Sequence, residues 1–418
     1  MDIWRCRGGR RLEGSCTVQG SKNASLPILA ACIALPVCAE LSNVPEISDV
    51  DSALEILRLL GCSAQRNENN IYIDSFTASA YEVPSAQMAK MRSSVFFMGA
   101  LLARFGRAKL SFPGGCLLGK RPIDIHIDAL RKMGARIDEN GGELDCRADS
   151  LVGTELFLPY PSVGATENIM LAALKAEGET IIHGAAKEPE IVCLQNFMRN
   201  IGCEIIGAGT DTIRIGRTES RGAVQFDIIP DRIAASTLAC AVAVCGGDVE
   251  LNNSEITHFS SVLHFLKCAG CDIIKNKTSV RIASDGKPDA VREIITGPYP
   301  AFPTDAQPLL MAALLKADGE SRFKENVFES RFRHVGELIK LGADIRIEED
   351  TALVRGMERL HGANMEATDL RGGAAMLIAA LAADGESVIY DMGHIRRGYE
   401  SLDRTLSQLG ADIEYTVQ

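Results

Sequence analysis

The sequence predicts a two-domain α/β protein built from six related units, and a recurring turn is the first of two observations behind this prediction. Six times, a helical pattern ends in a glycine, and a small residue then leads into a β run. These glycines are Gly61, Gly134, Gly202, Gly270, Gly342 and Gly410. Their spacings are 73, 68, 68, 72 and 68 residues. Because glycine commonly ends a helix in the left-handed conformation, we expect that conformation at each position.

The second observation is a helix that is apolar almost all round and occurs once in each unit. These helices are expected at 24–35, 93–103, 166–176, 233–244, 306–315 and 374–383. A helix without a polar face is buried on every side. Other helices, at 51–60 and 123–133, are amphipathic and are expected to face solvent on one side. Each unit is therefore predicted to run strand, buried helix, strand, outer helix, strand.

The six units are expected to divide three and three between two domains. Solenoid repeats are shorter, at about 20–50 residues, so a single stacked array is disfavoured. We predict one domain over 22–229 and a second formed by 1–21 with 230–418. Polar, glycine-bearing and proline-bearing stretches near 18–22 and 228–231 are the expected hinges. Two crossings between domains suit a pair that opens and closes around a ligand.

Composition excludes several classes of partner. The formal net charge is −11, so no bulk attraction to nucleic acid or to an anionic membrane is expected. No stretch reaches about 18 uncharged apolar residues, as a membrane span requires. The first residues lack the apolar core of a signal peptide. Thirteen cysteines then indicate reduced thiols and a cytoplasmic location, and we expect no obligatory protein partner.

The most distinctive loop is 111–126, which has the sequence S-F-P-G-G-C-L-L-G-K-R-P-I-D-I-H. Its glycines allow the backbone to pass close to a ligand. Lys120 and Arg121 place two cations near Cys116, which favours the thiolate form of a cysteine. A strand is expected before the loop, and Pro122 is expected at the first position of the following helix. Such a cationic loop suits an anionic substrate, although an ordinary surface turn with an incidental cysteine is the alternative.

The same loop nearly matches a phosphate-binding P-loop. Gly114, Gly119 and Lys120 have the required spacing. Arg121, however, stands where a serine or threonine must bind magnesium. A nucleotide triphosphatase is therefore not expected.

Charged residues recur where the buried helices begin. Asp231, Asp369 and Thr166 are expected to cap their helices, because such side chains accept hydrogen bonds from the free N–H groups. Lys22, Arg92 and Arg371 oppose the helix dipole, so capping does not explain them. If the two domains face each other, we expect Lys22, Arg92, Asp305 and Arg371 to line a shared cleft. Two arginine-bearing stretches, 329–334 and 394–400, are expected to serve carboxylate or phosphate groups.

Neither a metal nor a cofactor is predicted. Cys268 and Cys271 have half of a zinc-binding spacing, but Cys271 fills the small-residue position of the repeat and no second pair completes a site. The glycines at 202, 207 and 209 are not followed by a helix, so they form no dinucleotide-binding fingerprint.

Motifs along the whole chain resemble those of the enolpyruvyl transferases of the EPSP synthase family, and among them the members that act on UDP-N-acetylglucosamine. They include Gly20-Ser-Lys22-Asn23, Met91-Arg92-Ser, Pro113-Gly-Gly-Cys116, Gly119-Lys-Arg121-Pro, Ser162-Val-Gly-Ala-Thr-Glu-Asn168, Glu188-Pro-Glu190, Phe302-Pro-Thr-Asp305, Phe328-Glu-Ser-Arg331, Asp369-Leu-Arg371 and Arg397-Gly-Tyr-Glu400. The resemblance implies two inside-out α/β barrel domains, each with three βαβαββ repeats and buried helices. It also implies transfer of the enolpyruvyl group of phosphoenolpyruvate to the sugar's 3-hydroxyl with release of phosphate, the first committed step of peptidoglycan synthesis.

The resemblance also implies roles for individual residues. Cys116 is expected to donate a proton to C3 of phosphoenolpyruvate and to be alkylated by fosfomycin. Asp305 is expected to take the hydroxyl proton, while Lys22, Arg121 and Arg397 hold phosphoenolpyruvate and the leaving phosphate. The remaining expected substrate contacts are Asn23, Arg92, Pro122, Ile123, Asp124, Ile125, Ser162, Val163, Val327, Arg331 and Arg371.

Two departures and two alternatives remain. Tyr160 stands where some members have a lysine that reaches the nucleotide, and the pair Gly372 and Gly373 is interpreted as ordinary variation. The chain is alternatively an EPSP synthase, although those enzymes lack the Pro-Gly-Gly-Cys loop. A catalytically silent, sugar-nucleotide-binding paralogue is the other alternative.

Overall fold

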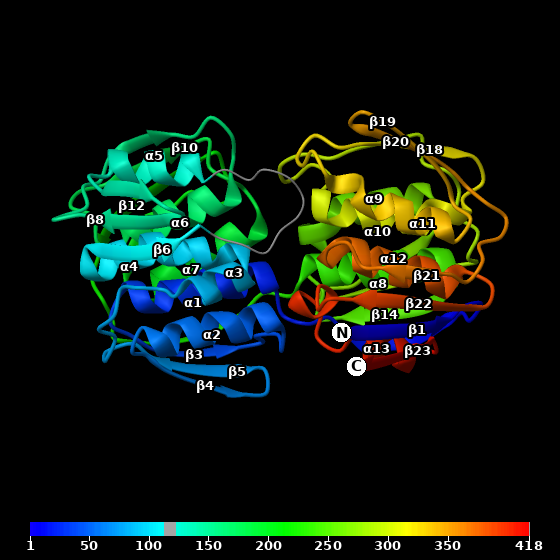
Figure 1. The fold of residues 1–418 in the computed structure, drawn as a ribbon, viewed down its shortest axis with the longest axis horizontal. Coiled ribbons are helices and arrows are strands. Elements are labelled where there is room, and N and C mark those ends of the chain that lie inside the picture. Colours follow the sequence, from blue (N-terminus) through cyan, green and yellow to red (C-terminus); the bar gives the residue numbers. More distant parts are fainter. Residues whose placement is uncertain (113–122, 418) are drawn as a thin grey trace. The chain divides into compact units, whose positions relative to one another are not determined.

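A computed structural model describes residues 1–112 and 123–417, and it divides into two compact units (Figure 1). Among the described residues, the N-terminal unit consists of 20–112 and 123–229. The C-terminal unit consists of 1–19 and 230–417. Each unit has its own hydrophobic core.

The N-terminal unit contains three sheets with one shared topology. A parallel contact joins two strands, and an antiparallel hairpin continues the sheet. The first sheet has the order β13 (Ala223–Asp227), β3 (Cys38–Ser42), β5 (Asn70–Asp74), β4 (Ser63–Asn67). The second has the order β6 (Arg107–Ser111), β8 (Glu143–Arg147), β7 (Arg136–Asn140). The third has the order β9 (Glu155–Phe157), β10 (Thr180–His183), β12 (Thr212–Thr218), β11 (Cys203–Ile206).

The C-terminal unit repeats this topology three times, and the N-terminal strands of the chain complete two of its sheets. The orders are β2 (Leu12–Thr17), β14 (Gly247–Asn252), β16 (Ser279–Ser284), β15 (Asp272–Lys275), then β17 (Glu293–Ile295), β18 (Glu320–Lys324), β20 (Thr351–Arg355), β19 (Asp344–Glu348), and finally β21 (Asn364–Glu366), β22 (Glu386–Asp391), β1 (Asp2–Arg7), β23 (Asp412–Val417). Strand β1 pairs antiparallel with both β22 and β23. Both described ends of the chain therefore lie in one sheet.

The six apolar helices are buried inside the units, as predicted. They are α1 (Lys22–Ala34), α4 (Phe96–Phe105) and α6 (Val163–Ala173) in the N-terminal unit, and α8 (Arg232–Cys245), α10 (Gln307–Ala313) and α12 (Leu370–Ala382) in the C-terminal unit. Within each unit these three helices pack against one another (Figure 1). Helices at the centre and sheets outside form the inside-out arrangement that the resemblance implied. No described helix is long and apolar enough to cross a membrane.

Shorter helices surround the buried ones. They are α2 (Ser48–Leu59), α3 (Ser85–Lys90), α5 (Asp124–Lys132), α7 (Pro189–Asn200), α9 (Ser260–Cys268), α11 (Val335–Lys340) and α13 (Leu402–Gln408). Six 3-10 turns accompany them among the described residues: η1 (Arg92–Val95), η2 (Ile256–Phe259), η3 (Thr304–Ala306), η4 (Leu314–Lys316), η5 (Arg331–His334) and η6 (Ile395–Arg397). The predicted amphipathic helices at 51–60 and 123–133 correspond to α2 and α5 and are confirmed.

All six repeat glycines adopt the predicted left-handed conformation, with φ between 90° and 102°. At Gly202 a Cβ would also lie 1.9 Å from the carbonyl oxygen of Glu219. The interpretation of Gly372 and Gly373 as ordinary variation stays a prediction, and the structure adds that both glycines are closely packed. A Cβ on Gly373 would lie 2.7 Å from a side-chain carbon of Ile395, so close packing requires glycine there.

Two of the three predicted helix caps are confirmed. Asp231 accepts hydrogen bonds from the backbone at 233 and 234, and Asp369 accepts from 371 and 372. The prediction for Thr166 is wrong, because α6 begins earlier and Ser162 caps it. Thr166 instead accepts a hydrogen bond from the backbone N–H of Ala186.

Candidate active site

Three of the predicted site residues meet within the C-terminal unit. Asp305 lies in η3, Arg331 begins η5, and Arg371 lies in the first turn of α12. Nη2 of Arg331 lies 3.3 Å from one carboxylate oxygen of Asp305, and Nη2 of Arg371 lies 3.2 Å from the other. Arg331 is fully buried and Arg371 is 3% exposed. Each carboxylate oxygen therefore faces a separate, buried guanidinium group.

Backbone and carboxylate groups hold Arg331 in place. Its Nε and Nη2 donate to the carbonyl oxygen of Thr304 at 3.0 and 2.8 Å. Its Nη1 lies 3.7 Å from Asp369, the cap of α12. His334 Nδ1 donates to the carbonyl oxygen of Arg331, and burial lowers the pKa of His334 to about 4, so this ring is neutral at pH 7. Buried charges require such compensation.

Glu325 joins the predicted contact Val327 to the same region. The backbone N–H of Val327 donates to one carboxylate oxygen of Glu325 at 2.8 Å. The hydroxyl of Thr304, next to Asp305, donates to the other at 3.0 Å. Sequence reasoning missed Glu325 and His334, and also missed the pairing of Asp369 with Arg331. The available signal was sequence position: His334 ends the stretch 329–334, Glu325 lies four residues before it, and Asp369 lies two residues before Arg371.

In the N-terminal unit, Lys22 forms a buried ion pair. It is the first residue of α1, and its Nζ lies 2.8 Å from Oδ2 of Asp49, in the first turn of α2. Their side chains are 10% and 4% exposed. The cation at this helix N-terminus thus has a carboxylate partner that sequence reasoning missed. Asn23 follows it in α1 and is half-buried.

The starts of α5 and α6 lie together in the same unit. Asn168 of α6 donates to Nδ1 of His126 at 3.0 Å and to the carbonyl oxygen of Val95 at 2.9 Å. Burial, with the nearby Arg92, lowers the pKa of His126 to about 4. A Cβ on Gly164, in the first turn of α6, would lie 3.1 Å from the His126 ring, so the helix starts that carry the predicted contacts Ile123, Asp124, Ile125, Ser162 and Val163 lie close together.

Four predicted site residues remain. Arg397 ends η6, close in sequence to Tyr399, whose ring lies against Arg371. Cys116, Arg121 and Pro122 lie outside the described residues.

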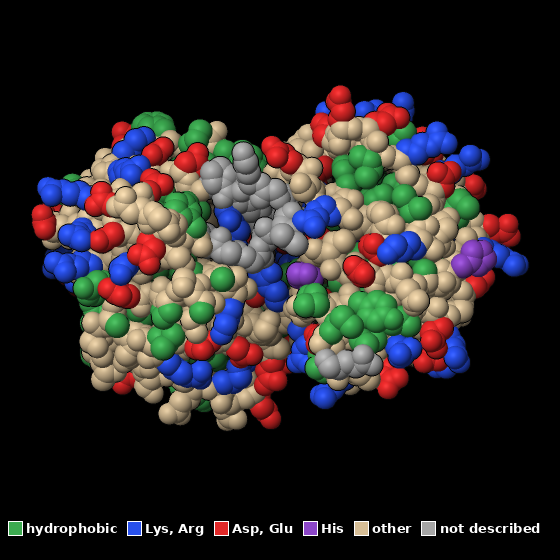
Figure 2. All heavy atoms as spheres, in the orientation of Figure 1, with side chains coloured by type: hydrophobic (Ala, Val, Ile, Leu, Met, Phe, Trp, Pro, Cys, Tyr) green, Lys and Arg blue, Asp and Glu red, His purple; other side chains and the backbone are tan. Residues whose placement is uncertain are grey.

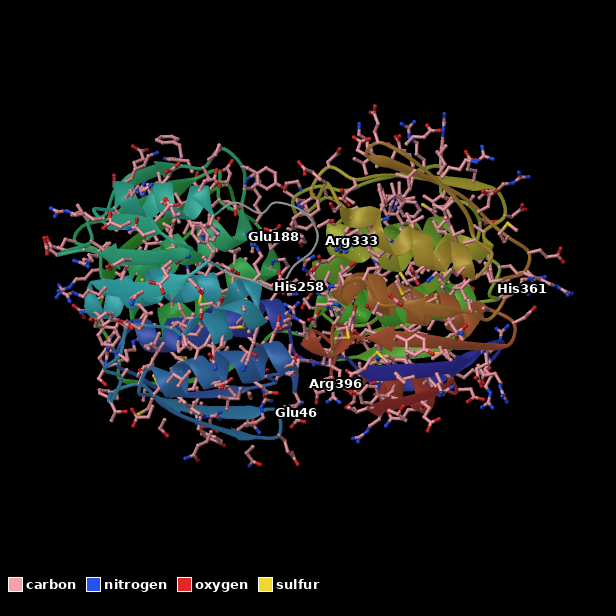
Figure 3. All side chains as sticks on the ribbon, in the orientation of Figure 1. Glu46, Glu188, His258, Arg333, His361 and Arg396 are labelled. Carbon is pink, nitrogen blue, oxygen red and sulfur yellow. The ribbon has the colours of Figure 1, made fainter. Side chains whose placement is uncertain are left out.

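Buried carboxyl groups at the start of α7 could suggest a cation site. Glu188 lies there (Figure 3), with Glu190 in the first turn. Burial, Glu190 and Glu188 raise the pKa of Glu167 well above its ordinary value. Over 1–112 and 123–417, no group of three His, Cys, Asp or Glu side chains is arranged to hold a metal ion.

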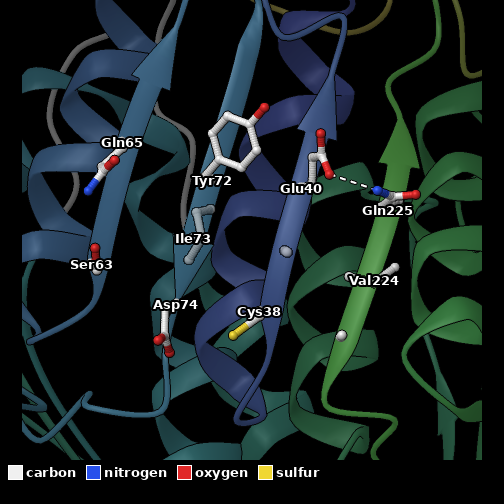
Figure 4. A pocket seen from close by; sticks show the side chains of 11 residues that line it. Cys38, Glu40, Ser63, Gln65, Tyr72, Ile73, Asp74, Val224 and Gln225 are labelled. Carbon is white, nitrogen blue, oxygen red and sulfur yellow. Dashed lines mark hydrogen bonds between the residues drawn. The ribbon is translucent and has the colours of Figure 1, made fainter.

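The two cysteines with half of a zinc-binding spacing differ in their surroundings. Burial raises the pKa of Cys271 to about 11, whereas Cys268 is exposed. Acidic and basic side chains are interspersed over the face in view in Figure 2. An open groove of about 630 Å³ crosses the outer face of the sheet β13-β3-β5-β4 (Figure 4), where Glu40 accepts a hydrogen bond from Gln225. None of the predicted site residues lines this groove.

Comparison with known proteins agrees with this architecture. Residues 6–406 match the model of the EPSP synthase (3-phosphoshikimate 1-carboxyvinyltransferase) family. The chain is 44% identical to UDP-N-acetylglucosamine 1-carboxyvinyltransferase 2 of Caldanaerobacter subterraneus subsp. tengcongensis, with 99% of each chain covered. It is also 44% identical to UDP-N-acetylglucosamine 1-carboxyvinyltransferase of Geotalea uraniireducens, again with 99% of each covered.

Solved structures show the same fold. The enolpyruvyl transferase NikO from Streptomyces tendae has a TM-score of 0.89 at 24% identity, covering 100% of this chain and 99% of its own. An EPSP synthase from Acinetobacter baumannii has a TM-score of 0.78 at 20% identity, with 100% of both chains covered. From the family match and the two full-length relatives together, the chain belongs to the EPSP synthase family of 1-carboxyvinyltransferases.

Proposed function

We propose that this chain transfers the enolpyruvyl group of phosphoenolpyruvate to the 3-hydroxyl of UDP-N-acetylglucosamine and releases phosphate, the first committed step of peptidoglycan synthesis. The observation that carries this proposal is full-length similarity, at 44% identity, to relatives named for the same transfer. The Asp305 carboxylate, which two buried arginines hold in place, is a candidate base and supports the proposal.

The reaction needs a base, an acid and cations. The hydroxyl oxygen bonds to C2 of phosphoenolpyruvate while its proton passes to the base, and C3 gains a proton from the acid. The bond from C2 to the phosphate oxygen then breaks, and C3 loses a proton to restore the double bond. We assign the base to Asp305 and the acid to Cys116. Fixed cations stabilise the departing phosphate.

We assign the substrate contacts from the resemblance to the family's motifs. Lys22, Arg121 and Arg397 hold phosphoenolpyruvate and the leaving phosphate, while Arg331 and Arg371 serve the carboxylate. The contacts proposed for the sugar nucleotide are Asn23, Arg92, Arg121, Pro122, Ile123, Asp124, Ile125, Ser162, Val163 and Val327. We propose small molecules as the only partners, and a cytoplasmic site of action.

Phosphate release measured with both substrates tests the proposal. We expect release with UDP-N-acetylglucosamine and none with shikimate 3-phosphate. The opposite result would favour EPSP synthase activity, which the family description makes the second candidate. Binding of the nucleotide sugar without release would indicate a silent paralogue.

Two variants locate the chemistry. Cys116→Ser should abolish release, whereas Cys38→Ser, which changes an exposed cysteine on the outer face of a sheet, should leave it unchanged. Cys116→Asp should keep turnover and resist fosfomycin. A fosfomycin-sensitive Cys116→Asp enzyme would contradict the role given to this residue.

A further inference from the structure

The start of a helix is an unfavourable place for a buried arginine, and Arg371 occupies such a place. It lies in the first turn of α12, where the positive end of the helix dipole disfavours a cation and the Asp369 cap opposes that dipole. It is 3% exposed, so water does not compensate its charge. Its Nε and Nη2 lie 3.3 and 3.2 Å from the same oxygen of Asp305. The geometry of this pair therefore depends on what holds the guanidinium from its other side.

The ring of Tyr399 packs against Arg371. The guanidinium carbon lies 5.5 Å from the ring centroid, within the range of a cation–π contact. Tyr399 is itself 3% exposed and lies between η6 and α13. Although burial alone lowers it, the pKa of Arg371 is raised overall by Tyr399, Asp305 and Asp231, so the group remains charged.

The hydroxyl of Tyr399 is fixed by the central helix α8. It lies 2.9 Å from the hydroxyl of Thr237. Thr237 donates its one hydroxyl proton to the carbonyl oxygen of Ile233 at 2.8 Å. The Tyr399 hydroxyl must therefore be the donor to Thr237. This bond sets the plane of the ring that faces Arg371.

The backbone on both sides of Tyr399 is also held. The side-chain amide of Gln19 donates to the carbonyl oxygen of Gly398 at 3.0 Å and accepts from the N–H of Glu400 at 2.8 Å. A Cβ on Gly398 would lie 2.7 Å from Leu370, so glycine allows this segment to approach the start of α12. Side chain and backbone together place the ring.

We propose that Tyr399 is a positioning residue for the transfer reaction: anchored by Thr237, it holds Arg371 and, through Arg371, the Asp305 carboxylate. Tyr399 is not assigned any contact with substrate. The assay rests on the proposed function, because it measures phosphate release from the two substrates. Release by the unaltered chain tests that function, and the variants below test the inference.

Removal of the hydroxyl tie is the first experiment. Thr237→Val removes the hydrogen bond from Tyr399, and Tyr399→Phe removes that bond together with the one between Arg371 and the Tyr399 hydroxyl. We expect kcat to fall about three- to tenfold in each. The KM for UDP-N-acetylglucosamine should stay within about twofold, because Asp305 acts in the chemical step. Because Tyr399→Phe already breaks the bond that Thr237→Val removes, the double variant should be no slower than Tyr399→Phe alone.

Conservative variants separate positioning from general damage. Thr237→Ser keeps the hydroxyl and should restore activity. Ser236→Ala is the matched control, because Ser236 also donates to the carbonyl four residues earlier in α8, that of Arg232, and should leave kcat unchanged. Thermal melts of every variant show whether it is folded.

A second background tests whether the effect passes through Arg371. In Arg371→Lys enzyme the flat guanidinium is absent, so adding Tyr399→Phe should cause no further loss of kcat. The inference would be overturned if the losses in kcat multiplied, either in this background or in the double variant of Tyr399→Phe with Thr237→Val. An equal loss in Ser236→Ala would also overturn it. If Tyr399→Phe does not fold, Thr237→Val in the Arg371→Lys background gives the same decision.

Discussion

The buried pair of Lys22 and Asp49 predicts a large stability effect from a small change. At 2.8 Å the two charges attract by about 6 kcal/mol if the effective dielectric constant is about 20. Asp49→Asn removes one charge at nearly constant shape and leaves the ammonium group buried. The Lys22 side chain is only 10% exposed, so hydration replaces little of the lost attraction. Breaking such a pair costs about 3–5 kcal/mol in unfolding free energy.

Urea unfolding followed by circular dichroism measures this loss. The double variant Lys22→Met with Asp49→Leu is the control, because it removes both charges. Replacement of a whole buried pair by apolar groups is often neutral, so this protein should regain most of the stability. The one tryptophan of the chain, Trp4, lies in β1 of the C-terminal unit. Its fluorescence should shift less than the dichroism signal, because each unit has its own core.

Either of two results would refute this reasoning. One is a loss below about 1 kcal/mol for Asp49→Asn, the size expected of a surface pair. The other is a double variant less stable than the single one, which would show that packing at this site matters more than charge.

Three further predictions concern buried groups. Burial lowers the pKa of His126 to about 4, so the unfolded chain binds an extra proton below about 6.5 and stability falls by about 3 kcal/mol towards pH 4. His126→Gln should flatten this part of the pH–stability curve in urea titrations, and an unchanged slope would contradict it. Burial and Glu190 raise the pKa of Glu167, so the contribution of Glu167 to folding stability weakens as pH rises above the ordinary carboxyl range. In thermal melts, Glu167→Gln should therefore gain stability relative to the parent protein from pH 5 to pH 8. A stability difference that stays constant over this range would count against the prediction. Gly373→Ala should cost about 1–3 kcal/mol by overpacking against Ile395, with partial recovery on adding Ile395→Val; no recovery would exclude this contact as the cause.

The buried helices were predictable because their signal is local. Helix α8 spans Arg232–Cys245, against a prediction of 233–244, because apolar residues fill every face and Asp231 supplies a cap. The repeat glycines were predictable for the same reason, since a left-handed turn depends on one residue. The start of α6 was missed because a hydroxyl residue within a helix has the same sequence signal as a cap, and Ser162 rather than Thr166 caps it.

The pairing of strands and charges was not predictable in this way. Strand β1 lies between β22 and β23, which follow it by more than 370 residues of chain, and no local pattern specifies such partners. Likewise, Lys22 was interpreted as a ligand-binding cation because it opposes the helix dipole. The structure adds a carboxylate from α2 that balances it. Sequence identified the unusual residues, while the fold supplies their partners.

The caps of the buried helices suggest why these partners differ between the two units. In the N-terminal unit, the serine hydroxyls of Ser21 and Ser162 cap α1 and α6. In the C-terminal unit, the carboxylates of Asp231 and Asp369 cap α8 and α12. A neutral cap satisfies the free N–H groups but leaves the positive end of the helix dipole uncompensated, whereas a carboxylate opposes it. The starts of α1 and α6 are therefore a better environment for an anion such as phosphate than the starts of α8 and α12. Those of the C-terminal unit can hold buried arginines, and with them the carboxylate that we assign as the base.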